Sequence, residues 1–464
     1  MILKNAKIYS EGLVREGAIL ILNGIIKSIS FESQDKELQE LIAENHDGKE
    51  INCQHKLILP GIIDIHSHLR DMEQIEKETF LTGTKAAAFS GITSVFTMPN
   101  TLPPAITSKQ VQLWMEKAKS GIYVDVGFIA GVPKEFNDRE IKKIVDLGVI
   151  GFKIYPLKSL NEIDWTKDSN IQKILDISSK YQITIFIHPD RSLNKKKWVE
   201  IYEDWVLEKY NVLELHDRLN PPQMELSYIR LFIDNLLKNI NVNKRNSDSY
   251  PIIHFCHISC RESFDLINHT LNQKNNLKIS FEITPHHLLL SKTVDLSNKN
   301  FGKVLPPLRS KSHSKYLFNK FGEGNIELIA TDHAPHTMEE KNREYLRVPS
   351  GFPGFESYPL VMLGKVTQYK LSLEHFVKAA SENPALKFNL KRKGFIKEGC
   401  DADLLIIEKI SETKINTQSF KTKAKYTPFE KFTTTVQIWK VFLRGVEINS
   451  DKSLPNGKIL KRLV

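Results

Sequence analysis

The segment Pro60-Gly61-Ile62-Ile63-Asp64-Ile65-His66-Ser67-His68 indicates a buried strand that ends in two histidines two positions apart. Side chains at positions i and i+2 of a strand point to the same side, so His66 and His68 present both imidazoles to one place. Two converging neutral imidazoles are typical of a metal site, most often a zinc site. The alternative is a pair of surface histidines at a strand–loop junction, because short histidine patterns also arise by chance.

The length and composition of the chain are those of a large globular protein. Its 464 residues suit one barrel with a smaller companion domain. The net charge of +10 comes from scattered lysines without interleaved aromatic residues, so we expect no nucleic-acid binding. No apolar run reaches the ~18 residues of a membrane helix, so we expect no membrane association. Four scattered cysteines and an N-terminus without a signal peptide favour a cytoplasmic protein.

Eight short apolar segments follow one another, with helical segments between many of them. Near-continuous apolar runs are typical of strands that helices bury on both faces. Most intervals between successive apolar segments match the ~30 residues of one βα unit. The interval between the fifth and sixth segments is longer and contains an insertion rich in helix formers, from Lys195 to about Asn241. The pattern predicts an α/β fold, a (β/α)8 barrel of the TIM type. The expected strands are Gly61–Ile65, Thr93–Met98, Val124–Ala130, Ile150–Tyr155, Ile183–Ile187, Ile252–His257, Ile279–Thr284 and Glu327–Ala330.

Strand-like sequence also occurs at both ends of the chain, before the first barrel strand and again in Ala402–Ile407 and Val436–Leu443. Neither terminal piece is long enough to bury a good core of its own. We therefore predict a small β-sandwich domain built from both termini, residues 1–58 and 395–464. The barrel is predicted to occupy residues 59–394.

Residues of the kind that bind metals recur at the ends of the predicted strands, where a barrel places its reactive groups. Each residue alone has an ordinary explanation, because a lone lysine often extends to water and a lone histidine is often a hydrogen-bonded core residue. Such residues at five of the eight strand ends are difficult to attribute to chance. The candidate site residues are His66, His68, Lys153, His188, His257 and Asp332.

Longer motifs resemble those of the amidohydrolase superfamily, most closely the dihydroorotases within it. The resemblance covers nearly the whole chain. Its most specific parts are Arg70 two residues after His68, the run Met98-Pro99-Asn100-Thr101, and the run Thr331-Asp332-His333-Ala334-Pro335-His336. Further matching motifs are Gly151-Phe152-Lys153, Thr284-Pro285-His286-His287, Pro353-Gly354-Phe355-Glu356 and Glu398-Gly399-Cys400-Asp401-Ala402-Asp403-Leu404.

This resemblance implies a site with two divalent metals, which we expect to be zinc. The two histidines of the first strand would bind one metal, and His188 and His257 would bind the other. Lys153 would bridge both as a carbamate formed with carbon dioxide, because a free amine with a pKa near ~10.4 is protonated and binds metals poorly. Asp332 would contact one metal and serve as the catalytic general base and acid.

The resemblance also implies a substrate. Dihydroorotate would be hydrolysed reversibly to N-carbamoyl-aspartate, a step of pyrimidine synthesis, with Arg70, Asn100 and His336 binding the substrate. A guanidinium such as that of Arg70 pairs with a carboxylate through two parallel hydrogen bonds. The chain departs from the usual family pattern at Met72, which replaces a proline, and at Leu305, which replaces an asparagine. These departures affect substrate choice more than the metal chemistry.

Two alternatives stay open at this point. One is another cyclic-amide hydrolase, such as an allantoinase or a hydantoinase of the dihydropyrimidinase type, against which Arg70 and Asn100 argue. The other is a non-catalytic dihydroorotase-like scaffold, although such proteins typically lose metal ligands and this chain keeps all six. The resemblance also leaves open a homo-oligomer and an association with aspartate transcarbamoylase.

Overall fold

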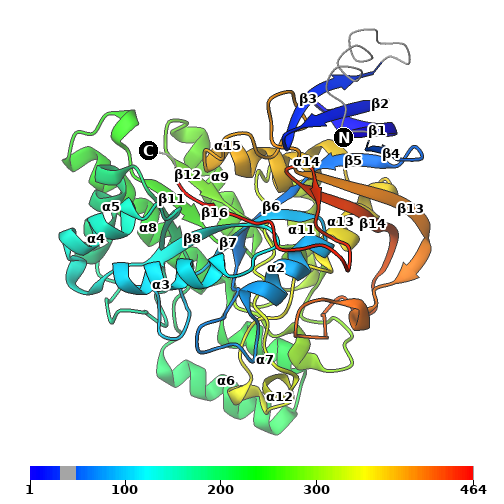
Figure 1. Cartoon of the computed structure of the whole chain (residues 1–464). Helices are drawn as coiled ribbons and strands as arrows, with labels where there is room; N and C mark the ends of the chain where they lie inside the picture. Colours follow the sequence, from blue (N-terminus) through cyan, green and yellow to red (C-terminus); the bar gives the residue numbers. More distant parts are fainter. Residues whose placement is uncertain (32–48, 463–464) are drawn as a thin grey trace.

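A parallel sheet of seven strands organises the larger part of the computed structural model, which describes residues 1–31 and 49–462 (Figure 1). The strands lie side by side in chain order, and every neighbouring pair is parallel. The prediction of a barrel-forming strand series is confirmed. The strands are β6 (Ile62–Ser67), β7 (Ile92–Thr97), β8 (Asp125–Gly131), β9 (Gly151–Ile154), β10 (Thr184–Ile187), β11 (Ile252–Phe255) and β12 (Ile279–Phe281).

The eighth strand position of the barrel is filled by a segment that makes only isolated bridges. Ile329 bridges in parallel to Ile283, just beyond β12, and His333 bridges in parallel to Ser67 at the end of β6. The segment therefore closes the sheet between its last and first strands. It does not form a longer regular strand, because Asp332 within it takes a left-handed φ of 49°.

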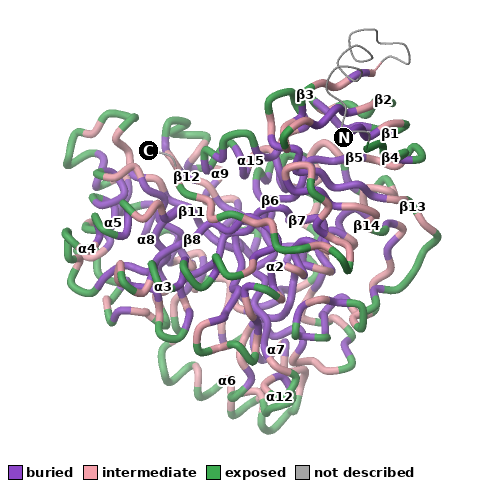
Figure 2. The backbone as a smooth tube through the Cα atoms, in the orientation of Figure 1, coloured by how far each residue is buried: buried purple, intermediate pink, exposed green. Residues whose placement is uncertain are grey.

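Helices cover the outside of the barrel, with their buried sides against the sheet (Figure 2). In α4, for example, Asn137 caps the first turn, and Ile141, Ile144 and Val145 form the buried face. Among the described helices, none has the length and apolar character that crossing a bilayer requires. The helices outside the insertion are α2 (Phe80–Phe89), α3 (Ser108–Lys119), α4 (Asp138–Asp146), α5 (Asp168–Tyr181), α9 (Arg261–Gln273), α10 (Pro285–Leu289), α11 (Lys311–Gly322), α12 (Met338–Lys341), α13 (Tyr358–Thr367), α14 (Leu373–Val377) and α15 (Asn383–Lys387).

The insertion between β10 and β11 consists of three helices, α6 (Lys195–Glu208), α7 (Val212–Leu219) and α8 (Pro222–Val242). Helix α8 packs against both α5 and α9, so it occupies the place of the barrel helix that follows β10. Helices α6 and α7 are therefore the part of the insertion that is additional to the regular helices of the barrel. They lie at the lower edge of the molecule in Figure 1.

A second, mostly antiparallel sheet is built from both ends of the chain, as expected. Its eight strands belong to one hydrogen-bonded sheet, in which β13 pairs with β5 and thereby joins the C-terminal to the N-terminal part. The short last strand β16 (Ile459–Leu460) lies outside this sheet and pairs with β8 of the barrel. The sheet comprises β1 (Ile2–Ser10), β2 (Leu13–Leu22), β3 (Ile25–Ser30), β4 (Glu50–Asn52), β5 (Leu57–Pro60), β13 (Leu404–Lys414), β14 (Thr433–Leu443) and β15 (Val446–Glu447).

A buried ionic cluster joins this terminal sheet to the barrel. Lys393 Nζ lies 2.7 Å from Asp125 Oδ2 on β8, and it lies 2.6 Å from Asp403 Oδ2 and 3.1 Å from Asp401 Oδ2 just before β13. Arg444 Nη1 adds a 2.7 Å contact to Asp125 Oδ2. Lys393 and the three aspartates are buried, so each of these charges is stabilised by its oppositely charged neighbours instead of by water.

We expect Lys393→Met to lower the free energy of unfolding by about 3–5 kcal/mol, the usual cost of breaking one side of a buried ionic cluster. Removing the ammonium leaves the buried carboxylates of Asp125 and Asp403 without their shared partner. Urea unfolding followed by tryptophan fluorescence measures the change. The exposed neighbour Lys391 provides the control, and equal stability of Lys393→Met and Lys391→Met would contradict the expectation.

Candidate metal centre

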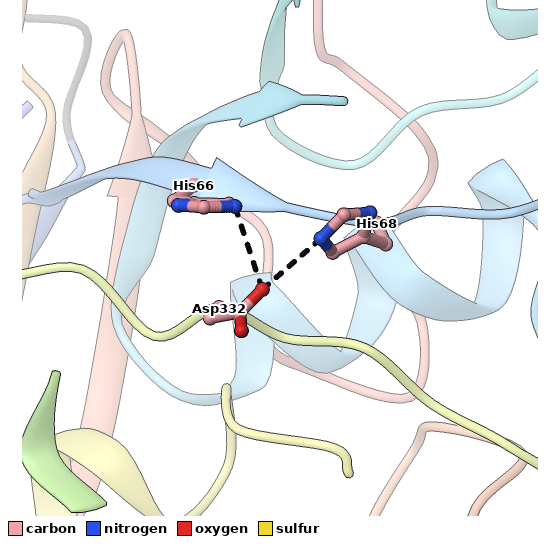
Figure 3. A group of neighbouring side chains, drawn as sticks. All are labelled: His66, His68 and Asp332. Atoms are coloured by element: carbon pink, nitrogen blue, oxygen red, sulfur yellow. Dashed lines mark hydrogen bonds and ion pairs between the residues drawn. The ribbon is translucent and has the colours of Figure 1, made fainter. Parts of the chain in front are cut away.

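Three of the predicted site residues meet at the point where the barrel closes (Figure 3). Asp332 Oδ1 lies 3.0 Å from His68 Nε2 and 3.4 Å from His66 Nε2. The two histidines come from the end of β6, and Asp332 lies in the closing segment that bridges β6 at Ser67. The two imidazoles and the carboxylate therefore converge because their backbone segments are neighbours.

A pair of histidines forms the other half of the site. His188 follows β10 and His257 follows β11, and these adjacent strands pair Ile187 with Phe255. His188 Nδ1 lies 2.9 Å from His257 Nε2. The ring centroids of His257 and His66 are 5.2 Å apart, so the two halves form one continuous cluster.

Lys153 points into the same region from β9. Its side chain is almost fully buried, and Nζ donates a hydrogen bond to Cys256 Sγ over 2.8 Å. Lys153 makes no ion pair with a carboxylate in the part of the chain that the structure describes. A buried ammonium without a carboxylate partner is energetically unfavourable.

Two histidines of the cluster, His68 and His188, are in the neutral state that binds metals. Burial lowers the pKa of His68 to about 4 and that of His188 to about 3, with the Lys153 ammonium adding to the effect at His188. Both rings are therefore neutral at pH 7 and offer a nitrogen lone pair. Burial also lowers the pKa of His66, but the charge of Glu282 outweighs this and raises it to about 10. The place next to Glu282 and Asp332 thus favours positive charge, as a cation site does.

The outward nitrogens of the first two histidines are held by side chains behind them. His66 Nδ1 contacts Glu282 Oε1, and Glu282 Oε2 also lies 3.1 Å from His254 Nε2. His68 Nδ1 donates to Asn100 Oδ1 over 2.6 Å. Such contacts fix the ring orientation and leave Nε2 of both histidines directed at the centre. Asn100, predicted to bind substrate, therefore contacts His68 in the structure.

Glu282 contacts His66 from behind, which is the supporting role that its place beside the proposed ligands allowed as an alternative to a plainly buried role. The available signal is an acidic residue inside the apolar run Ile279–Thr284. A second such residue is Asp64, inside the isoleucines of β6. Its carboxylate accepts hydrogen bonds from His66 N and Thr331 N, both over 3.1 Å, and from Thr331 Oγ1 over 2.5 Å. Asp64 thereby ties the first strand to the closing segment.

Two residues of the cluster have left-handed backbone conformations. His257 has a φ of 38° and Asp332 a φ of 49°. Such conformations cost about 1–3 kcal/mol for non-glycine residues and concentrate at functional sites. The strain directs both side chains into the barrel mouth.

Of the two adjacent histidines after β12, one has a structural role. His287 Nδ1 lies 2.8 Å from Thr284 Oγ1, and His287 Nε2 lies 3.1 Å from Pro306 O. His286 Nε2 and His257 Nδ1 are buried without a hydrogen-bond partner among the described residues. Unpaired buried nitrogens are uncommon in proteins, so these two fit a site that takes a bound group.

Arg70 and His336 contact each other beside the metal cluster. Arg70 Nη2 lies 3.1 Å from His336 Nε2, and Arg70 Nε donates to Pro335 O over 3.3 Å. Only 7% of Arg70 is exposed, and it makes no ion pair with a carboxylate within residues 1–31 and 49–462. A buried guanidinium without a counter-ion is suited to an anionic ligand.

The loop after Arg70 has an unusual backbone. Arg70, Asp71 and Met72 have φ values of 56°, 55° and 52° in succession. Proline is restricted to a φ near −65°, so the proline that is usual at the position of Met72 could not take this conformation. The loop therefore differs in backbone shape from one that has a proline at this position.

Comparisons with known proteins agree with the architecture and the motifs. The amidohydrolase family matches residues 57–220 and 323–448. A protein named dihydroorotase from Methanosphaera stadtmanae is 34% identical over 437 residues, which are 93% of this chain and 92% of the relative. A protein of the same name from Pyrococcus abyssi is 34% identical over 458 residues, 97% of this chain and 96% of the relative.

Solved structures show the same fold at lower identity. The L-hydantoinase (dihydropyrimidinase) from Arthrobacter aurescens superposes with a TM-score of 0.86 at 23% identity, over 99% of both chains. The D-hydantoinase from a Thermus species superposes with a TM-score of 0.83 at 24% identity, over 99% of this chain and 98% of the other. The resemblance to dihydroorotases that the motifs indicated is confirmed by sequence relatives, and the chain belongs to the amidohydrolase family.

Proposed function

We propose that this chain is a dihydroorotase, which hydrolyses the cyclic amide of dihydroorotate reversibly to N-carbamoyl-aspartate. The observation that carries the proposal is Arg70, a buried guanidinium without a carboxylate partner in the described structure, beside a cluster of metal-binding side chains. Dihydroorotate carries a carboxylate on its ring, which would complete this arrangement. The dihydroorotase relatives at 34% identity support the same activity.

The donor set fits two divalent cations, for which we propose zinc. One would be held by His66, His68 and Asp332, whose donor atoms lie within 4.8 Å of one another. The other would be held by His188 and His257. Neutral imidazoles and carboxylate oxygens are usual zinc ligands, although manganese or cobalt also accept them. Such cations supply Lewis acidity and lower the pKa of a water to the neutral range.

Lys153 would complete the ligand set as a carbamate. The support is its burial without a carboxylate partner among the described residues, in a position between the two halves of the cluster. Its amine nitrogen would form a bond to the carbon of carbon dioxide and lose a proton. The product is an anionic oxygen donor, which suits a bridge between two cations.

Asp332 is positioned to move the proton in the reaction. Burial raises the pKa of its carboxyl, but the charges and hydrogen bonds of His66 and His68 outweigh this and hold the pKa below its usual value. Asp332 is therefore an ionised base before reaction. Its carboxylate would accept a proton from the attacking water and deliver it to the ring nitrogen as the carbon–nitrogen bond breaks.

Substrate orientation would depend on Arg70 and on the residues that fix it. Arg70 would form a paired hydrogen-bonded contact with the ring carboxylate. His336 contacts Arg70 on one side, and its Nδ1 lies 3.2 Å from Glu340 Oε2 on the other, so the guanidinium has a fixed position. Asn100 would act through His68, since its amide oxygen contacts that ring.

The alternatives differ in what they require of the site. A hydantoinase or allantoinase acts on a cyclic amide without the ring carboxylate, so it would have little use for Arg70. A non-catalytic scaffold would not need the six ligand residues, which the chain retains. A homo-oligomer and an association with aspartate transcarbamoylase stay predictions.

Replacing Lys153 with alanine should abolish hydrolysis of dihydroorotate and lower the metal content. The reason is that the variant lacks the anionic bridge between the two cations. Elemental analysis and a turnover assay measure the two effects, and small carboxylic acids should restore part of the activity by filling the space. An active, fully metal-loaded Lys153→Ala protein would contradict the carbamate.

Replacing Glu282 with glutamine should weaken metal affinity by about 10–100-fold, as is usual when the partner of a metal-binding histidine is lost. The amide is close in size to the carboxylate, so packing is retained, but the negative charge behind His66 disappears. A chelator titration of the metal-loaded protein measures the affinity. Unchanged affinity would mean that Glu282 has only a packing role.

Replacing Arg70 with methionine should reduce kcat/KM for dihydroorotate at least ~100-fold, since a paired charged contact in a buried site contributes far more than a surface ion pair. The metal content should not change, because Arg70 is not among the proposed ligands. Comparing ring amides with and without the carboxylate on both proteins gives the sharper measurement. The parent should strongly prefer the acid, and a variant that keeps this preference would favour the hydantoinase or allantoinase alternative.

A further inference from the structure

A separate pocket lies between α2 and the segment 418–425, which belongs to the long connection from β13 to β14. Its volume of about 570 Å³ is within the range of small-molecule sites. The lining contains three lysines and no aspartate or glutamate, and it includes none of the proposed metal ligands. The residues used below are Thr82, Lys85, Tyr123, Phe420, Lys421 and Lys425.

Two lysines of this pocket contact the same aromatic ring. Lys85 Nζ lies 5.7 Å from the ring centroid of Phe89 and 5.6 Å from that of Tyr123, and Lys421 Nζ lies 4.5 Å from the same Phe89 ring. Cation–π contacts of this kind keep the ammonium groups in place. Two like charges beside one ring disfavour each other, and an anion that contacts both would reduce this cost.

Carboxylates compensate this charge only weakly. Within the described ranges, Lys85 and Lys425 make no ion pair. Lys421 Nζ has Asp451 Oδ1 at 3.9 Å, but the Asp451 side chain is 91% exposed, and exposed pairs at such distances contribute little. Lys425 Nζ donates to the backbone oxygen of Phe420, which holds it at the pocket wall.

We propose that this pocket is a second ligand site, which binds a small phosphate-bearing anion. Three ammonium groups around an open volume suit a multiply charged anion with several acceptor oxygens, and lysine is an established phosphate ligand. The pocket lies apart from the metal centre, so the proposal does not depend on the substrate of the catalytic site.

A chain of contacts connects the pocket to the metal centre. Thr82, in the pocket wall, and Thr422, next to Lys421, both donate through Oγ1 to the buried carboxylate of Glu78. Glu78 Oε2 packs 3.8 Å from His333 Nε2, a distance that is too long for a hydrogen bond, and His333 O accepts a hydrogen bond from His68 N over 2.7 Å. An anion that bridges Lys85 and Lys421 would act on both segments that hold Glu78, and we expect its effect to pass to His68 through the packing of Glu78 against His333.

Calorimetric titration of the full, metal-loaded chain with inorganic phosphate at constant ionic strength tests the site. We expect the parent to bind phosphate saturably. The affinity for phosphate should fall about tenfold for each ammonium that is removed, so it should fall in Lys425→Gln and fall further in the double variant Lys85→Gln/Lys421→Gln. The charge-retaining variant Lys85→Arg/Lys421→Arg should bind phosphate, and Lys142→Gln on the exposed face of α4 should behave as the parent does. Lys425 is exposed, so Lys425→Gln is informative even where the double variant does not fold.

The proposal would be overturned if the parent showed no saturable binding of phosphate, or if the parent and the glutamine variants bound phosphate with equal affinity. Loss of phosphate binding in Asp332→Ala would also overturn it, because that result would assign the phosphate to the metal centre.

Turnover of dihydroorotate measures the connection between the sites. Saturating phosphate should change turnover in the parent more than in Lys85→Gln/Lys421→Gln. An equal change in both proteins would refute the connection through Glu78.

Discussion

The closure of the barrel by the segment around Asp332 is the constraint on which the rest of the structure depends. The Asp64 carboxylate accepts hydrogen bonds from the backbone of both His66 and Thr331, and it thereby fixes the first strand against the last. Without this contact, the carboxylate of Asp332 would not face the histidines of β6. The three donors satisfy the hydrogen-bonding capacity of this aspartate, although its burial still raises the pKa of the carboxyl to about 7.

Around that closure, the site combines two kinds of polar residue. Some side chains face the centre, and others stand behind them and fix their orientation. Glu282 and Asn100 belong to the second kind, since each contacts the outward nitrogen of a histidine. This arrangement directs the inward nitrogens of His66 and His68 at Asp332 and at the centre of the site. Strained backbone at His257 and Asp332 is compatible with stability because the surrounding barrel is closely packed.

The sequence identified the barrel strands well, because a buried parallel strand is a nearly continuous apolar run with a recognisable length. It also located the candidate ligands, because these stand where such runs end. It could not assign the partners of those ligands. Glu282 is distant from His66 in the chain, and its contact with that ring depends on how β12 and β6 lie across the barrel. The position of β16 beside β8 was likewise not expected, since two residues carry too weak a pattern.

By itself, the sequence determined the α/β strand order, the joining of both termini into one β-domain, and the residue types at the barrel mouth. These properties follow from local apolar patterns and from side-chain chemistry, which need no knowledge of distant contacts. The tertiary structure alone decided that Asn100 contacts His68, that His287 rather than His286 has the structural role, and that Arg70 is buried without a carboxylate partner among the described residues. Such facts depend on contacts between segments far apart in the chain, and local sequence does not encode the distances between them.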